Sequence, residues 1–320
     1  MTATTAVDTL PERLRTLLTQ PTATQYNNFS EWKQGFFKLC EHNTSSWERA
    51  LLGGAQVTCV GYAFAAGYQA ALQQLQGETA QGVTRLSALC VTEANGNHPR
   101  AIATTLTPAT RNNEYLLNGS KTFISGGDQA DELLVAASTG LDGAGRPILQ
   151  LVRVPSGAAG VTITPMPPLP FVPEASHASV RFDKVFVTEQ ALLTGDGYSD
   201  YVKPFRTLED IHVTLALCGY LISVARRIQL PQAQIPALLS MAAQHVQLAL
   251  LPPQQSVTHL LLDAARQQLE QCLPLLEAHW AQHAHASFAN WQRDKALLKI
   301  ASKAREQRTA TALQQLLGTP

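Results

Sequence analysis

The stretch LNGSKTFISGG, Leu117–Gly127, decides how the rest of the sequence is interpreted. Its Asn-Gly pair lies between two β-like runs and predicts a tight hairpin turn, because both residues tolerate positive φ. The run after the turn ends in Ser125 and two glycines, so a hydroxyl and bare backbone come together at a strand terminus. This combination raises the question of whether the segment is only a turn or whether a ligand binds at the strand end.

The sequence around this stretch falls into three sections that differ in composition and residue pattern. Residues 46–76 are rich in Ala, Leu and Gln and contain no proline, which predicts helices packed closely through small residues. Residues 86–193 contain short β-like runs separated by Gly, Pro, Asn and Asp, the pattern of an antiparallel sandwich or barrel. Long helical patterns follow at 205–227, 256–280 and 291–317. We therefore expect an α+β chain of three domains: helical 1–85, antiparallel β 86–197, and a helical bundle 198–320.

Composition narrows the classes of function. The 320 residues hold 24 basic and 24 acidic side chains, so the formal net charge is zero and sequence-independent binding to nucleic acid is not expected. Five cysteines without CxxC spacing fit a reducing compartment. The first residues lack a basic segment followed by an apolar run, and the most apolar run is too short and polar to cross a bilayer. These features predict a cytoplasmic protein without a membrane span.

Three ordered segments of the β section resemble the acyl-CoA dehydrogenase family. They are LCVTEANGN at 89–97, the opening stretch at 117–127, and ASVRFDKVFVTEQALLTGDGY at 178–198. The similarity covers roughly residues 86–225 and is looser in the flanking helices. It implies the family's fold and a flavin-dependent dehydrogenase that acts on an acyl thioester.

The resemblance also implies which residues bind FAD. Val91 and Thr92 correspond to the positions at the pyrimidine side of the flavin, Ser125 to the position at N5, and Phe123 to the aromatic position beside the ring. A flavin ring needs flat apolar support together with donors and acceptors along one edge. The alternative interpretation is that Thr92 and Ser125 are ordinary strand hydroxyls and that Phe123 belongs to the core. We expect Lys121 to be a solvated strand residue.

The sequence departs from the family pattern in three places. After Val-Thr-Glu the chain reads ANGNHPRA instead of the family's Gly-Ser-Asp, although amides around Gly96 could form a nest that receives an anion. The family's Arg-x-x-Phe-Gly motif is replaced by ARRIQLPQAQIPALL. The Tyr-Glu-Gly-Thr segment that carries the usual base is not in the sequence. We therefore expect a divergent, C-terminally shortened member, with a non-catalytic subunit or binding protein that has lost FAD as the alternative.

Some family members place the base near the start of the first helix after the β-domain, which corresponds to Glu209 here. A carboxylate there would remove the α-proton while a hydride passes from Cβ to flavin N5. The competing interpretation is structural, because Thr207 and Asp210 have capping-box spacing and Glu209 would then only complement the helix dipole.

The remaining expectations concern metals and partners. His279, His283 and His285 cluster in HWAQHAH, but the HExxH pattern is absent and no metal site is expected. The resemblance implies an acyl-thioester substrate on CoA or a carrier protein, and an electron-accepting partner. It also implies a homo-oligomer or a hetero-oligomer with a related subunit.

Overall fold

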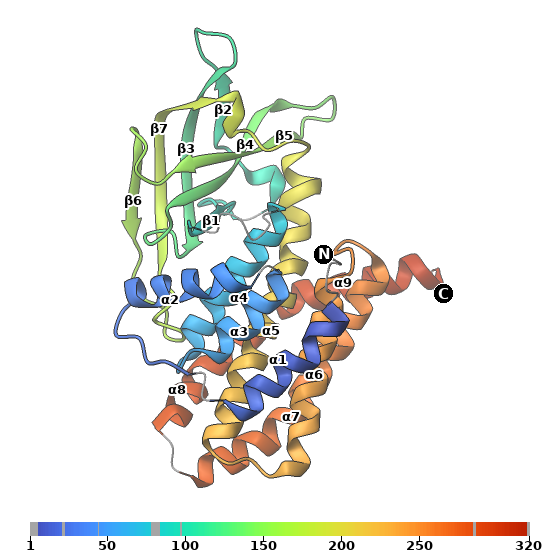
Figure 1. Cartoon of the computed structure of the whole chain (residues 1–320). Coiled ribbons are helices and arrows are strands. Elements are labelled where there is room, and N and C mark those ends of the chain that lie inside the picture. The colour runs from blue at the N-terminus through green and yellow to red at the C-terminus, as the bar shows by residue number, and fades with distance from the viewer. Residues whose placement is uncertain are drawn as a thin grey trace. The chain divides into compact units, whose positions relative to one another are not determined.

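The computed structural model describes residues 6–20, 23–43, 45–77, 84–96, 98–283 and 286–318, drawn in Figure 1. The chain forms two compact units. One is helical and comprises Met1–Gly82, Pro170–Val172 and Thr207–Pro320, and the other contains the strands and comprises Val83–Leu169 and Pro173–Arg206. The helices on both sides of the β section thus share one unit, while the division into three domains stays a prediction.

The helices take up the two ends of the chain, as the sequence predicts. Before the strands come α1 (Ala6–Thr19), α2 (Phe29–His42), α3 (Ser46–Ala55) and α4 (Val60–Leu75). After them come α5 (Lys203–Arg227), α6 (Ile235–Ala249), α7 (Ser256–Gln282), α8 (Ala286–Asp294) and α9 (Ser302–Leu317).

Small residues let the helical unit pack tightly, which confirms the expectation for residues 46–76. A Cβ on Gly54 of α3 would lie 1.8 Å from the carbonyl oxygen of Ala216 on α5. A Cβ on Gly219 would lie 2.0 Å from the carbonyl oxygen of Leu51. The backbones of α3 and α5 therefore touch at a distance that excludes any side chain at these two positions.

Two helical segments, 291–317 and Gly197–Arg227, differ from what the sequence predicts. The pattern at 291–317 is interrupted, because Ala301 adopts a left-handed φ of 59° between α8 and α9. The stretch Gly197–Arg227 is long and apolar enough to cross a membrane, but 83% of its apolar window is buried within the protein. A buried core helix accounts for its composition.

The described strands of the β unit form a seven-stranded sheet. The hydrogen-bonded order is β1-β4-β2-β3-β7-β6, with β5 paired to β4. Most pairings are antiparallel as expected, whereas β1 and β2 run parallel to β4. The strands are β1 (Ser87–Cys90), β2 (Thr105–Pro108), β3 (Glu114–Ser125), β4 (Glu132–Leu141), β5 (Pro147–Pro155), β6 (Val161–Pro165) and β7 (His177–Thr188).

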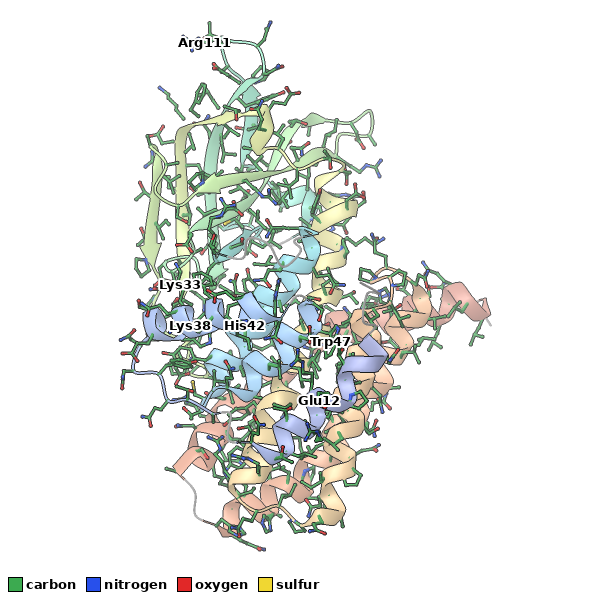
Figure 2. The ribbon with its side chains drawn as sticks, in the orientation of Figure 1. Glu12, Lys33, Lys38, His42, Trp47 and Arg111 are labelled. Carbon is green, nitrogen blue, oxygen red and sulfur yellow. The ribbon has the colours of Figure 1, made fainter. Side chains whose placement is uncertain are left out.

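The hairpin predicted at Asn118-Gly119 is wrong, because β3 runs straight through it. Two residues of β7, one of them Lys184 at φ 50°, oppose Asn118, whose side-chain oxygen accepts a hydrogen bond from the Lys184 amide at 2.8 Å. Gly119 has φ 147°, and a Cβ there would lie 2.5 Å from Thr104 Oγ1. Asn118 thus lies at a β-bulge, and Gly119 allows the backbone of β3 to approach Thr104 closely. The turn lies between β2 and β3 instead, with Arg111 at its tip (Figure 2).

A buried histidine links three helices of the helical unit. His212 on α5 is fully buried, with Nδ1 2.7 Å from the Leu208 carbonyl oxygen and Nε2 3.0 Å from Ser46 Oγ on α3. Ser46 Oγ also lies 2.6 Å from Gln74 Oε1 on α4. Burial, with a contribution from the nearby His245, lowers the pKa of His212 to about 4. The folded protein therefore keeps this imidazole neutral.

We predict that acid weakens the protein through His212. Between pH 7 and pH 5 the unfolded histidine takes up a proton and the folded one does not, so the free energy of unfolding should fall by about 2 kcal/mol. Urea denaturation at both pH values measures this loss. His212→Gln should reduce the difference by about that amount, while the share of His245 and His177, whose pKa values burial also lowers, remains. His42→Gln, at the exposed end of α2 (Figure 2), is the control and should leave the difference unchanged. An equal difference in wild type and His212→Gln would contradict the assignment.

Candidate functional site

A second bulge shapes the end of β3. Thr122 and Phe123 together oppose the single residue Ser179 of β7, since Lys121 pairs with Val180 and the next pairing is that of Ile124. Phe123 has φ 53°, a conformation that costs a non-glycine residue free energy. Its ring is 59% exposed, so the prediction that it could be a core residue is wrong. A strained backbone here presents a flat apolar surface to solvent.

The segment that follows β1 is attached to this end of β3. The amide of Thr122 donates to the Thr92 carbonyl oxygen at 2.8 Å, and Lys121 Nζ donates to the Val91 carbonyl oxygen at 3.3 Å. The amides of Val91 and Thr92 and the Thr92 hydroxyl have no hydrogen-bond partner among the described residues, and both residues are only half-buried. The structure thus brings Val91 and Thr92 next to the strand end that carries Phe123.

The prediction that Lys121 is solvated is wrong. Its side chain is buried and its Nζ lies 2.8 Å from Glu93 Oε1. The Glu93 carboxylate also accepts from the amides of Ala103 and Thr104, at 2.9 and 3.0 Å, and from the Thr104 hydroxyl at 2.8 Å. The Glu of the Val-Thr-Glu segment is therefore a buried junction between the β1–β2 connection and β3.

Charge and hydrogen bonding keep Glu93 ionised. Burial alone would raise the pKa of its carboxyl group, but the hydrogen bonds from Lys121, Ala103 and Thr104 outweigh burial and hold the pKa below its usual value. Its contribution to stability is therefore present above the ordinary pKa of a glutamate and is lost as the pH falls below it.

Ser125 is the last residue of β3 and lies beside a histidine. Its Oγ is 3.3 Å from Nε2 of His177, the first residue of β7. Burial lowers the pKa of His177, opposed by a hydrogen bond to Ala175 and by the charge of Asp128, so the imidazole is neutral at pH 7. Because 3.3 Å is long for an O–H···N bond, the Ser125 hydroxyl remains able to turn towards another acceptor.

The turn after Glu93 is closed on itself. The Gly96 amide donates to the Glu93 carbonyl oxygen at 2.9 Å, and the Glu93 amide donates to the Gly96 carbonyl oxygen at 3.0 Å. The Gly96 amide itself is therefore not available to an anion, while the expectation that amides around Gly96 form an anion-binding nest stays a prediction. Asn97 lies outside the described residues, and His98 Nδ1 accepts from the Arg100 amide at 3.1 Å.

Glu209 lies on α5 in the helical unit and is half-buried. The capping-box interpretation of its neighbours is wrong, because α5 begins at Lys203 after one π-helical turn, and Glu209 lies beyond its first turn. Thr207 instead accepts from Arg308 Nη1 at 3.3 Å. A helix-dipole role for Glu209 also loses its basis, since the effect is confined to the first turn.

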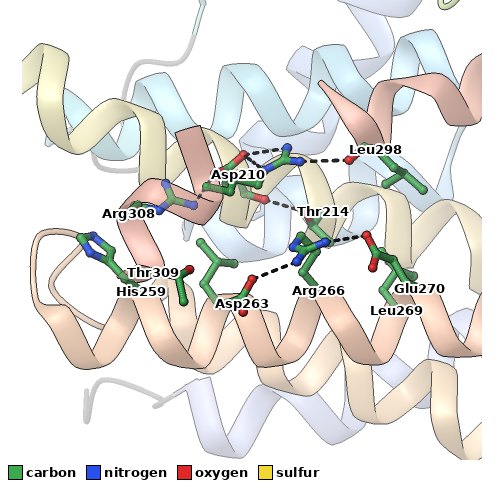
Figure 3. Close-up of a pocket in the computed structure, with 12 residues that line it drawn as sticks. Asp210, Thr214, His259, Asp263, Arg266, Leu269, Glu270, Leu298, Arg308 and Thr309 are labelled. Atoms are coloured by element: carbon green, nitrogen blue, oxygen red, sulfur yellow. Dashed lines mark hydrogen bonds and ion pairs between the residues drawn. The ribbon is translucent and has the colours of Figure 1, made fainter. Parts of the chain in front are cut away.

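Asp210 attaches α9 to α5. Its two oxygens lie 3.0 Å from Arg305 Nη2 and 2.6 Å from Arg308 Nη2. Figure 3 shows these groups around a cavity of about 30 Å³, where Arg266 of α7 pairs with Asp263 at 3.0 Å and with Glu270. Such a volume holds about one water molecule, and the charges lining it are paired with one another. The ion pairs of Asp210 link α5 to α9, and those of Arg266 lie within α7.

The histidines of HWAQHAH bind backbone groups. His279 Nε2 lies 3.2 Å from the Ile228 carbonyl oxygen, and His283 Nδ1 lies 2.8 Å from the His279 carbonyl oxygen. His285 lies outside the described residues. Within the described part of the chain no group of three potential metal ligands occurs.

Comparison with known proteins identifies the β section. The family model of the acyl-CoA dehydrogenase middle domain matches residues 88–185. No curated protein matches the chain by sequence.

Solved structures match over nearly the whole chain. Butyryl-CoA dehydrogenase from Megasphaera elsdenii is similar with a TM-score of 0.67 at 13% identity, covering 96% of this chain and 98% of that chain. Glutaryl-CoA dehydrogenase from Mycobacterium smegmatis gives 0.62 at 15%, covering 99% and 96%. PigA with FAD and proline gives 0.62 at 13%, covering 98% and 97%. The middle domain thus belongs to the acyl-CoA dehydrogenase family and the whole chain has that family's fold, as the motifs predict.

We predict that the Glu93–Lys121 pair stabilises the β unit strongly. Lys121→Met leaves the Glu93 carboxylate buried without its counterion, and Glu93→Gln leaves the Lys121 ammonium group buried without its counterion. Either change should lower the free energy of unfolding by about 3–5 kcal/mol. Denaturant titration of the two variants gives the values.

The double variant provides the sharper result. Lys121→Met with Glu93→Gln removes both charges, so its loss should be clearly smaller than the sum of the two single losses. Arg111→Ala, at an exposed turn, is the control and should change stability by less than about 0.5 kcal/mol. Additive losses in the double variant would mean that the two side chains do not stabilise each other.

Proposed function

We propose that the chain is a flavin-dependent acyl-thioester dehydrogenase that binds FAD at the end of β3. The observation that carries this proposal is the exposed Phe123 on a strained backbone, beside the amides of Val91 and Thr92, which have no partner among the described residues. Strained residues in folded proteins gather at ligand sites. A flat apolar surface next to unpaired donors suits an isoalloxazine ring.

The residues present fit the flavin part of the cofactor. Phe123 would support the ring, the amides and hydroxyl at Val91 and Thr92 would bind its pyrimidine edge, and Ser125 would bind at N5. Bound FAD would supply the hydride acceptor. The neutral His177 would lie beside the Ser125 hydroxyl without adding charge next to the ring.

Glu209 is the proposed base. Its carboxylate would accept the α-proton of the acyl thioester while the hydride leaves Cβ, so that a carbon–carbon double bond forms and both electrons leave the substrate. Hydrogen bonds to the thioester oxygen would stabilise the enolate-like charge that develops. The competing helix-dipole role does not apply to Glu209, because it lies beyond the first turn of α5.

The family resemblance suggests the setting of this reaction. We propose a cytoplasmic enzyme that transfers its electrons to a partner and assembles as a homo-oligomer or with a related subunit. The substrate would be an acyl thioester carried by CoA or by a carrier protein.

A non-catalytic subunit or binding protein without FAD is the second candidate. One observation favours it: the Gly96 amide, which could have met a cofactor phosphate, is used within its own turn. The ring part of the site and the phosphate part therefore support different conclusions, and flavin binding separates them.

We predict that the purified chain binds flavin and is yellow, or becomes yellow with added FAD. Ser125→Ala removes one hydrogen bond of about 1 kcal/mol, so flavin affinity should fall about fivefold, measured by fluorescence quenching of the added flavin. Ser138→Ala, a serine near the far end of β4, should bind like wild type. A chain that stays colourless with excess FAD would support the second candidate instead.

We predict that Glu209→Gln abolishes bleaching of the bound flavin by an acyl thioester and leaves the visible spectrum of the oxidised flavin unchanged. The amide has the size of the carboxylate and cannot take up the proton. The neighbouring Asp210→Asn is the matched control: it should keep the bleaching and lower the melting temperature, because it weakens the pairs with Arg305 and Arg308. Bleaching that persists in Glu209→Gln would remove Glu209 as the base.

A further inference from the structure

We propose that a polar hollow on the face of β3, β6 and β7 opposite the β core binds a phosphoryl group. The hollow has a volume of about 190 Å³. The side chains that line it are Ser120, Thr122, Thr162, Thr164, Ser179 and Arg181. The site is a feature of the sheet itself and does not depend on the proposed flavin site.

Strand register assembles these side chains into two rows. Arg181 of β7 pairs with Ser120 of β3 on one side and with Thr162 of β6 on the other. Ser179 pairs with Thr164 on one side, and its Oγ lies 3.1 Å from Thr122 Oγ1 on the other. Neighbouring strands lie about 4.8 Å apart and alternate residues about 7 Å apart, so the six side chains cover roughly 10 by 7 Å.

Most hydroxyls in the hollow are available to a ligand. Those of Ser120, Thr162 and Thr164 have no hydrogen-bond partner within the described part of the chain. The Thr122 hydroxyl donates to Met166 Sδ at 3.7 Å and lies 3.1 Å from Ser179 Oγ, so this pair keeps further lone pairs but no spare hydrogen. A ring of hydroxyl donors suits a ligand with several acceptor oxygens, and an apolar ligand would gain nothing from these groups.

The charge of the hollow favours an anion. Arg181 is the one charged side chain among those that face it, because Lys121 contributes only from the strand and its Nζ is paired with Glu93 on the core side. Arg181 is 71% exposed, and its ion pair with Asp183, itself 59% exposed, is long at 3.5 Å. An exposed pair of this kind is weak, so the guanidinium can engage a phosphoryl group with two parallel hydrogen bonds.

The volume allows more than free phosphate. The phosphoryl group of a nucleotide or of a thioester carrier fits together with part of the adjoining chain. Both sources share the same chemistry, a tetrahedral group with acceptor oxygens and negative charge, and titration with matched ligands distinguishes them.

Titration calorimetry with inorganic pyrophosphate at low salt tests the proposal. Wild type should bind saturably, and Arg181→Met should weaken binding about tenfold or more, since it removes a charge-assisted hydrogen-bond pair. Thr162→Val with Thr164→Val should weaken binding severalfold. Arg146→Met, an exposed arginine at the β4–β5 turn, should bind like wild type. The side chains changed are exposed, so melting temperatures should stay close to that of wild type.

Two outcomes overturn the proposal: wild type that shows no saturable binding, or Arg181→Met that binds pyrophosphate as tightly as wild type. Paired titrations then identify the source. If Arg181→Met lowers affinity for FMN and leaves riboflavin unchanged, the phosphoryl group is that of the flavin. If it lowers affinity for coenzyme A and leaves pantetheine unchanged, the group is that of the thioester carrier. Equal losses within a pair would contradict recognition of a phosphoryl group.

Discussion

The buried ion pair between Glu93 and Lys121 is the interaction on which the candidate site depends. Lys121 joins β3 to the segment after β1, and Glu93 extends the connection to Thr104 ahead of β2. Removal of either partner would destabilise the fold, because an unpaired buried ion raises the free energy of the folded state by several kcal/mol. The pair therefore holds Val91 and Thr92 at the end of β3, where local backbone preference alone would not.

The same constraint explains how the protein tolerates strain at Phe123. Lys121 is held by Glu93 before the bulge, and Ile124 is buried in the β core after it. Between two fixed points the extra residue must bulge outward, so Phe123 takes a positive φ and its ring faces solvent. The exposed aromatic surface is thus a consequence of buried charge and apolar packing on either side of it.

Sequence predicted the fold well because composition, periodicity and three ordered motifs agree with it. The sequence-based prediction was wrong where one residue pattern is compatible with two different local structures. Positive φ at Asn-Gly suits a hairpin and also a bulge, and only the contact of Gly119 with Thr104 decides between them. Lys121 was predicted to be solvated because its partner is 28 residues away. Helix α6 is not among the helical patterns identified in the sequence, and its Pro236 lies in the first turn, where the missing N–H is harmless.

The ring part and the phosphate part of the proposed FAD site would have separate physical origins in this chain. The ring part would rest on the bulge at Phe123 and on the amides of Val91 and Thr92, which have no hydrogen-bond partner among the described residues. The phosphate part would need free donors in the turn after Glu93, where the Gly96 amide closes its own turn. Free hydroxyls and a weakly paired arginine occur instead on the face of β3, β6 and β7 opposite the β core. Ring binding and anion binding would depend on different residues. Substitutions that alter anion binding would therefore leave the residues proposed for ring binding in place. A chain of this fold can therefore keep a flavin surface while its anion contacts move or disappear.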